Sequence, residues 1–373
     1  MRLICALLGL IALPAWAQPY AYIPNSGSDT VSVIDDATGV VVETINITGA
    51  QPRAVAVSPT ANLAYIGNRT SNSISVIDTA TNTEVTTIPA IGSPLGIVFS
   101  PDGTRAYVTE FIGSYRVLAI DTATHAVVAS LPVGDNPYGL VITPDGSKLY
   151  AGNYISDTIS VIDVASFTVT ATIPVGLRPL QLAITPDGSR LVVANGNSNN
   201  LLVIDTATDT VTDTIPVGFR TVGVAVSIDG ATAVVTSDQS TDIAIVDLGA
   251  GTLSSTVPVG VLSWGVDFTP DGSRIYVTLF DGTVLVLDAT TLAVLDTIAV
   301  GTLPLAHGRF FATPVAVPPP PIAQGVQLDA VPGAPVIYAE EIIASPGSPV
   351  TLLNPAGDLN LSANLGYSFS IGE

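Results

Sequence analysis

The chain has 373 residues, of which 31 are acidic and only 11 are basic, so its formal net charge is −20 at pH 7. Such an acidic surface repels nucleic acid and anionic lipid, which excludes both as expected partners. The single cysteine, Cys5, excludes a disulfide framework and a cysteine-based metal site.

The first 17 residues have the features of a secretory signal. A charged start at Arg2 precedes an apolar run over residues 3–13, and Ala-Trp-Ala at 15–17 is a small-x-small cleavage motif. The apolar run is shorter than the about 20 residues that cross a bilayer. We therefore expect an exported protein in the periplasm, at the cell surface or secreted, without a transmembrane segment. Loss of Arg2 leaves a net charge of −21.

The trio Val-Ile-Asp, or a close variant, returns seven times along the chain. Its aspartates are 43, 43, 42, 42, 42 and 41 residues apart. A period in the low forties made of short β-like runs is typical of propeller blades. The seven trios lie at 33–35, 76–78, 119–121, 161–163, 203–205, 245–247 and 286–288.

One repeat, residues 177–218, shows the pattern that the others share. Its apolar runs are four to seven residues long, rich in Val, Ile and Thr, and separated by Gly, Pro, Asp and Asn. These are strand and hairpin signals, and the runs are too short for helices. We expect four strands, at 180–185, 191–195, 201–204 and 211–217.

Two kinds of aspartate turn recur with the repeats. Pro-Asp-Gly occurs at 101–103, 144–146, 186–188 and 270–272, and degenerates to Ile-Asp-Gly at 228–230. Proline presets φ, Asp bonds nearby backbone and Gly takes positive φ, so we expect tight turns. The aspartate after each Val-Ile is expected to accept backbone N–H bonds. The alternative, calcium binding, needs six to eight oxygens on one ion, which one carboxylate per blade cannot supply.

The two ends of the repeat array indicate how the ring closes. Residues 20–24 read as a second-type strand with no first-type strand before them, and residues 305–311 read as an extra first-type strand. Pairing these two segments removes open sheet edges. We therefore expect an all-β fold, a seven-bladed β-propeller over residues 18–313 with four-stranded blades.

Several strand motifs carry a family resemblance. The stretches 64–67, 106–109 and 275–278, Val-Ile-Asp-Thr-Ala-Thr at 76 and 203, and Thr-Ile-Pro-Val-Gly at 172 and 214 resemble the YVTN-repeat β-propellers. The resemblance covers residues 20–313 and implies the lactonase-like propeller superfamily, with relatives of surface-layer and periplasmic type. Similar propellers include lactonase-like enzymes, a lyase and quinoprotein subunits, so the resemblance leaves function open.

The chain beyond the repeats differs in composition. Residues 314–321 include four consecutive prolines and read as a stiff linker. Residues 322–373 are expected to form a tail that is partly β or poorly ordered. The alternative is an attachment or partner-binding segment.

The candidate ligand-binding residues lie in loops that meet at one mouth of the predicted channel. Three arginines at nearly equivalent positions would bind a carboxylate or phosphate through forked hydrogen bonds. The alternative is that they neutralise acids or cap loop carbonyls. Aromatic residues of the same loops would stack a sugar or an aromatic ligand, or simply pack the loops. The predicted residues are Arg53, Arg178, Arg220, His307, Tyr138 and Trp264, with Phe111 and Tyr154 as further aromatics.

Catalysis is a weaker hypothesis. His125 is expected to be solvated in a turn. His307 could be a lone general base at the channel and, with Glu110 or Asp267 nearby, could assist hydrolysis; the alternative is a strand histidine whose hydrogen bonds are satisfied. We predict no catalytic residue, no metal ligand and no cofactor. The preferred function is a noncatalytic, monomeric scaffold that binds an unknown protein or a small anionic or carbohydrate ligand. The alternative is a lactonase-like hydrolase, a lyase or a quinoprotein-type subunit with its site at the arginine-lined mouth.

Overall fold

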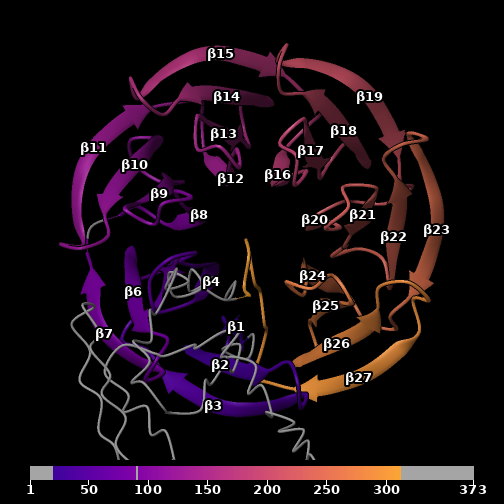
Figure 1. Cartoon of the computed structure of the whole chain (residues 1–373), viewed down its shortest axis with the longest axis horizontal. Helices are drawn as coiled ribbons and strands as arrows, with labels where there is room; N and C mark the ends of the chain where they lie inside the picture. The colour runs from indigo at the N-terminus through magenta and orange to yellow at the C-terminus, as the bar shows by residue number, and fades with distance from the viewer. Residues whose placement is uncertain (1–19, 90, 312–373) are drawn as a thin grey trace, which may run out of the picture. The chain divides into compact units, whose positions relative to one another are not determined.

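The computed structural model describes residues 20–89 and 91–311, and within them every regular element is a β-strand. The strands form seven antiparallel sheets arranged as the blades of a ring, which confirms the predicted seven-bladed propeller (Figure 1). The predicted signal (1–17), linker (314–321) and tail (322–373) lie outside the described residues. No described helix is long and apolar enough to cross a membrane.

The blades follow each other along the chain, and blades 2 to 7 each run from an inner to an outer strand. The first three contain β1 (Tyr20–Asn25), β2 (Thr30–Asp35) and β3 (Val40–Asn46); β4 (Pro52–Val57), β5 (Leu63–Asn68), β6 (Ser73–Asp78) and β7 (Thr83–Ile88); and β8 (Pro94–Phe99), β9 (Arg105–Glu110), β10 (Arg116–Asp121) and β11 (Ala126–Pro132).

The remaining four blades have the same order. They contain β12 (Pro137–Ile142), β13 (Lys148–Asn153), β14 (Thr158–Asp163) and β15 (Thr168–Pro174); β16 (Pro179–Ile184), β17 (Arg190–Asn195), β18 (Asn200–Asp205) and β19 (Thr210–Pro216); β20 (Val224–Val226), β21 (Thr232–Val235), β22 (Asp242–Asp247) and β23 (Thr252–Pro258); and β24 (Ser263–Phe268), β25 (Arg274–Leu279), β26 (Thr283–Asp288) and β27 (Val294–Ala299).

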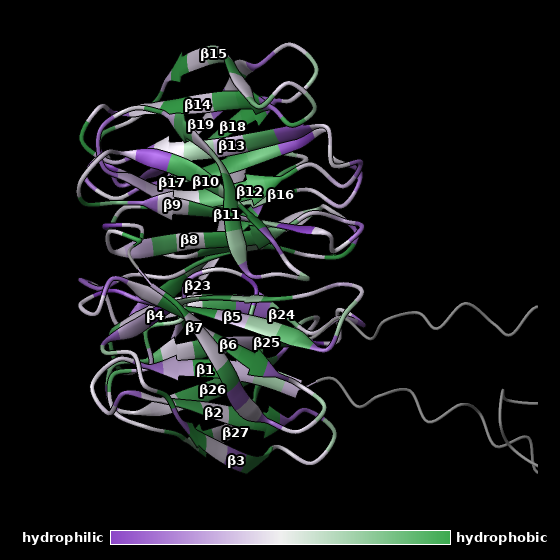
Figure 2. Cartoon of the chain, turned by 90° about the vertical axis from the view of Figure 1, so that its left-hand side faces the viewer, coloured by the Kyte–Doolittle hydropathy of each residue, from purple (hydrophilic) through white to green (hydrophobic). Residues whose placement is uncertain are grey.

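Burial explains why the middle strands are almost continuously apolar. The four central residues of β14, β18 and β26 are all buried, because each blade packs against a neighbour on both of its faces. The outer strands face solvent, and five of the first six residues of β19 are Thr, Val or Asp with high exposure. Figure 2 shows the apolar colour concentrated in the strands and the polar colour in many of the turns.

The ring closes where it was predicted to close, but not with a regular strand. Pro304 bridges Asn25 and Phe311 bridges Ala21, while the Tyr22 N–H donates to the carbonyl of Phe310 at 2.8 Å. These two anchor points are seven residues apart, whereas the equivalent pairs in blade 5, Pro179 with Asn195 and Ile184 with Leu191, are five apart. The two surplus residues form a bulge within the closing segment, which is the orange trace inside the ring in Figure 1.

The bulge brings His307 against blade 2 as well as blade 1. The His307 N–H donates to the carbonyl of Arg53, and the Val55 N–H donates to the carbonyl of His307, both at 2.8 Å. Asp267 of blade 7 also holds this segment, since its carboxylate accepts from the Phe310 N–H at 3.1 Å. Three blades therefore contribute to the closure.

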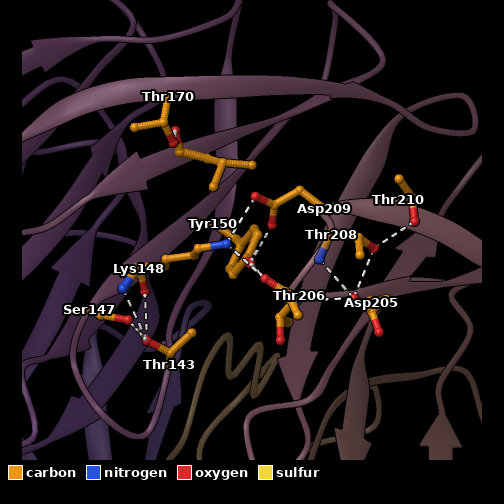
Figure 3. Close-up of polar contacts among 12 residues, drawn as sticks. Thr143, Ser147, Lys148, Tyr150, Thr170, Asp205, Thr206, Thr208, Asp209 and Thr210 are labelled. Atoms are coloured by element: carbon orange, nitrogen blue, oxygen red, sulfur yellow. Dashed lines mark hydrogen bonds and ion pairs between the residues drawn. The ribbon is translucent and has the colours of Figure 1, made fainter.

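Tyrosines on the second strand of a blade reach the outer turn of the next blade, and we call these contacts latch pairs. The Tyr22 hydroxyl donates to Asn82, and that of Tyr150 donates to Asp209, at 2.7 and 2.8 Å. The Tyr65 hydroxyl lies 2.7 Å from Nδ1 of His125, which is half-buried in the predicted turn, so this histidine has a protein partner in addition to its solvent-exposed side. Figure 3 shows Lys148 and Tyr150 beside Asp209.

The turn residues of these three latch pairs share one backbone conformation. Asn82, His125 and Asp209 all have φ between 53 and 57°. Asn, Asp and His occupy this left-handed region more readily than most residues, and their side chains can then form a hydrogen bond with the tyrosine hydroxyl. Where the second strand carries Val192 in place of tyrosine, the turn position is Gly251, which has no side chain to offer.

Candidate binding site at the channel mouth

The loops that enter the inner strands and those that join the second and third strands meet at one end of the ring, the mouth. The side chains there belong to five successive blades: Leu95, Tyr138, Leu180 and Val222 form a buried cluster, with Phe111, Tyr154 and Trp264 packed against it. Inner strands such as β8, β12 and β16 place these residues immediately after a proline at the strand start. This end of the channel is therefore lined by large apolar and aromatic side chains.

His307 is the polar centre of the mouth. The Trp264 indole N–H donates to its Nε2 at 2.7 Å, and the Tyr138 hydroxyl lies 3.0 Å from the same atom. Because an indole N–H can only donate, Nε2 carries no hydrogen and the imidazole is neutral. Burial, reinforced by the nearby charge of Arg53, holds the pKa of His307 well below its usual value.

The other imidazole nitrogen faces a residue that the sequence did not single out. Nδ1 lies 3.2 Å from the side-chain nitrogen of Gln181; because Nε2 accepts from Trp264, Nδ1 carries the hydrogen, and turning the Gln181 amide by about 180° gives that hydrogen the carbonyl oxygen as its acceptor. Gln181 occupies the position that Gly96 and Gly139 occupy in blades 3 and 4. This replacement of a repeated glycine by a polar residue is the sequence feature that could have identified Gln181. Gln181 and His307 together connect blades 5 and 1 across the channel.

Arg53 is the cation nearest to this centre. Its guanidinium carbon lies 5.9 Å from the ring centroid of Trp264, a cation–π contact. The residue is half-buried, its Nε is buried without a hydrogen-bond partner, and no carboxylate of the described residues forms an ion pair with it. Burial lowers its pKa, as expected for a cation that lacks a counter-charge.

The other two predicted arginines have different surroundings. Arg178 is exposed, donates to the Tyr154 hydroxyl at 3.1 Å and lies 5.2 Å from that ring centroid. Arg220 forms an ion pair with Asp238 at 2.9 Å, so its charge is neutralised as in the alternative interpretation. Of the three predicted arginines, Arg53 and Arg178 therefore remain available to an anion.

A fourth arginine, Arg69, lies in the loop after β5 and was not among the predicted ligand-binding residues. Its side chain contacts Gln51 at 3.5 Å, and its charge acts on both Arg53 and Tyr138. Burial raises the pKa of Tyr138 to about 12 against the opposing effect of these two arginines. The Tyr138 hydroxyl is thus a neutral donor beside two positive charges.

The mouth aromatics form a compact group of three, Phe111, Tyr138 and Tyr154, which we call the aromatic trio. Their ring centroids are 5.7 Å (Phe111–Tyr138), 6.1 Å (Phe111–Tyr154) and 6.1 Å (Tyr138–Tyr154) apart, in edge-to-face or tilted orientations. These contacts fit the packing interpretation of the aromatics, because the rings stabilise each other. The trio nevertheless leaves Phe111 and Tyr154 half-buried beside Arg178.

The arrangement needed for a His307 general base does not form. Glu110 forms an ion pair with Arg116 at 2.7 Å, and the carboxylate of Asp267 accepts from the backbone N–H groups of Phe268 and Phe310. Neither contacts His307, whose Nε2 already accepts from Trp264. Within residues 20–89 and 91–311, no three His, Cys, Asp or Glu side chains converge as a metal site.

The opposite end of the ring, the far face, has a cleft of about 420 Å³ between blades 4 and 5. Its polar groups are bound to one another: Asp145 accepts from Thr143 and Ser147, and Asp187 accepts from Thr185 and Ser189. Lys148 pairs with Asp209 at 2.9 Å. The hydrogen-bonding groups of the cleft are thus already used within the turns, so we place the candidate site at the mouth.

Comparisons with known proteins agree with the fold. Residues 18–148 match a family described as YNCE-like beta-propeller, and residues 89–215 match one described as Lactonase, 7-bladed beta-propeller. The resemblance to the lactonase-like propeller superfamily is therefore confirmed. No curated protein matches the chain.

Two solved structures illustrate the similarity. Kuenenia stuttgartiensis hydrazine synthase is 25% identical with a TM-score of 0.65, over 73% of this chain and 92% of that one. A functionally unknown protein from Desulfotomaculum acetoxidans is 15% identical with a TM-score of 0.68, over 78% of this chain and 99% of that one. The second similarity concerns the fold alone.

Proposed function

We propose that this protein is an exported, noncatalytic propeller that binds a ligand bearing a carboxylate or phosphate at the mouth. The observation that carries the proposal is Arg53, a half-buried guanidinium with an unpartnered Nε and no ion pair among the described residues. A cation held partly out of water without a counter-charge is costly, and an anionic ligand removes that cost. Arg178 offers a second fork at the rim.

The surroundings of Arg53 support binding more than catalysis. The His307 imidazole is buried, neutral and already accepts a hydrogen bond, so it positions Trp264 and Tyr138 and takes up no proton from a substrate. Trp264 and Tyr138 in turn border the Arg53 guanidinium. Rigid aromatic walls around a fork of donors are a common form of ligand site.

A lactonase-like enzyme is the second candidate, favoured by the match of residues 89–215 to a lactonase propeller family. In such an enzyme Arg53 would polarise a lactone carbonyl and a water would be the nucleophile. The arrangement offers Tyr138 as a hydrogen-bond donor beside Arg53. Turnover of a lactone by the purified protein, abolished by Arg53→Met, would favour this candidate over simple binding.

Export rests on the charged start, apolar run and Ala-Trp-Ala motif of residues 1–17. N-terminal sequencing of the protein recovered from expressing cells should find Gln18 as the first residue. Recovery of the intact N-terminus from the cytoplasmic fraction alone would contradict export.

The binding proposal is tested by thermal shift of the purified protein against benzoate, succinate, inorganic phosphate, neutral sugars and lactones at fixed ionic strength. We expect carboxylates or phosphate to raise Tm in a saturable manner, and Arg53→Met to remove the effect. Arg105→Met, on the far face, is the matched control because it also removes one arginine, and the shift should survive it. An equal anion shift in wild type and Arg53→Met would overturn the proposal.

A further inference from the structure

We propose that the mouth on the side of blades 3 to 5 docks an extended peptide segment in which acidic side chains alternate with large apolar ones. This inference rests on the proposed function, because the acidic side chain is the anion that Arg53 or Arg178 would receive. It adds the class of partner: a protein segment, in place of a free sugar or small acid.

Three large aliphatic side chains are exposed around the aromatic trio. Ile112 follows Phe111, Ile155 follows Tyr154, and Leu177 precedes Arg178; their exposed fractions are 54, 52 and 53%. The Arg178 guanidinium stacks on the ring of Tyr154. The backbone N–H of Arg178 donates at 2.8 Å to Asp157, which belongs to the same loop as Tyr154 and Ile155. Leu177 therefore lies next to that loop. We call Ile112, Ile155 and Leu177 the aliphatic rim.

The rim departs from the repeat. Ile112 and Ile155 lie two residues after the end of the second strand, and the other five blades have small or polar residues there, namely Gly27, Thr70, Asn197, Ser237 and Asp281. Ile155 is not required by its turn, because Gly27, Thr70 and Asn197 occupy the same place in loops of the same four-residue length, whereas Ile112 belongs to a longer loop, residues 111–115. Single exposed apolar residues are common, but three around one aromatic group indicate a contact surface.

The combination of side chains selects the partner's chemistry. Aromatic rings and arginines are the residues most enriched at the centres of protein interfaces, and Phe111, Tyr154 and Arg178 lie together inside the rim. A sugar site would use the rings and hydrogen bonds, yet it would gain little from exposed isoleucine and leucine. An extended peptide can place apolar residues on the rim and an acidic residue on Arg178, which follows the rim residue Leu177 in the chain.

Charge complementarity favours an acidic segment in particular. The protein as a whole has a net charge of −20, which would attract basic peptides without specificity. At the mouth, by contrast, Arg53 and Arg178 form no ion pair with the described carboxylates. A peptide that is acidic overall binds there only if these two arginines and the rim outweigh the long-range repulsion and the carboxylates of Asp135 and Asp157 in the same loops.

The test uses fluorescein-labelled ten-residue peptides and fluorescence anisotropy with the purified full chain. The probe alternates Asp with Leu and Phe; one control peptide replaces Asp with Lys, and another replaces Leu and Phe with Ser. We expect the probe to bind at least tenfold more tightly than either control peptide. The triple variant Ile112→Ser/Ile155→Ser/Leu177→Ser should weaken the probe at least tenfold and leave the benzoate thermal shift unchanged.

The matched control is Ile228→Ser, which removes a side chain of 52% exposure from the far face and should not change probe binding. Equal binding of the three peptides, or of wild type and the triple variant, would overturn the inference. A retained benzoate shift in that case would leave the proposed function standing. Sedimentation that shows a dimer dissociated by the triple variant would identify a second copy as the occupant and would also overturn it.

Discussion

The mouth and the far face are built by the same repeat, and they differ in how their charged groups are satisfied. On the far face, Asp205 accepts from the N–H of Ala207 and Thr208, and Asp187 accepts from Thr185 and Ser189. At the mouth, Arg53 is half-buried without an ion pair and its Nε has no partner. The far face uses its polar side chains to stabilise turns, whereas the mouth leaves the charge of Arg53 without an ion-pair partner among the described residues.

The largest expected effect on stability is on the far face, where Asp36 of blade 1 binds two residues of blade 7. The Asp36 carboxylate accepts from Arg274 at 3.0 Å and from the buried Tyr276 hydroxyl at 2.7 Å. Asp36→Ala leaves both donors without this acceptor and should lower the free energy of unfolding by about 2–4 kcal/mol. Urea denaturation measures it, with Asp296→Ala on the exposed outer strand as the control. Equal stability of the two variants would contradict a structural far face.

Two arginine variants at the mouth sharpen the comparison. Arg220→Met leaves Asp238 without its cation and should cost about 1–2 kcal/mol of unfolding free energy. Arg53→Met removes a cation that has no counter-charge and puts an unbranched apolar side chain beside Trp264, so stability should stay equal or rise by up to about 1 kcal/mol. Urea denaturation of both decides this. A larger loss for Arg53→Met would mean that Arg53 is structural.

A smaller difference in unfolding free energy is expected between two of the tyrosines that contact the next blade, Tyr150 and Tyr107. The Tyr150 hydroxyl donates to Asp209, whereas Tyr107 meets the ring of Phe167 at 6.0 Å between centroids. Tyr150→Phe should therefore lower the unfolding free energy by about 1 kcal/mol more than Tyr107→Phe. Denaturant midpoints of the two variants test this directly, and the reverse order would show that packing alone holds the blades together.

The smallest effect is the pH dependence of one far-face turn. Hydrogen bonds from the Thr185 hydroxyl, and then from Ser189, lower the pKa of Asp187 to about 2. A carboxyl with a lowered folded-state pKa stabilises above its unfolded pKa of about 3.9, and this contribution is lost as pH falls towards 2. The Tm difference between wild type and Asp187→Asn should thus narrow from pH 6 to pH 2. A constant difference would refute the assignment.

The fold was predictable because its signals repeat. The Asp205 turn, the Pro-Asp-Gly at 186–188 and the apolar run of β18 recur in most blades, so each blade supports the assignment of the others. The bulge at His307 was not predictable, because its two surplus residues show only when the anchors Pro304 and Phe311 are known. Nor was the neutralisation of Arg220, since Asp238 belongs to a loop 18 residues away and its approach depends on tertiary structure.

The most direct test of a ligand site at the mouth is the fluorescence of Trp264 during titration with benzoate. The chain has two tryptophans, and the other, Trp16, lies in the expected signal. Because Trp264 contacts both His307 and Arg53, we predict a saturable change in its emission that disappears in Arg53→Met and persists in Arg105→Met. Emission that benzoate leaves unchanged, or changes equally in Arg53→Met, would contradict the account.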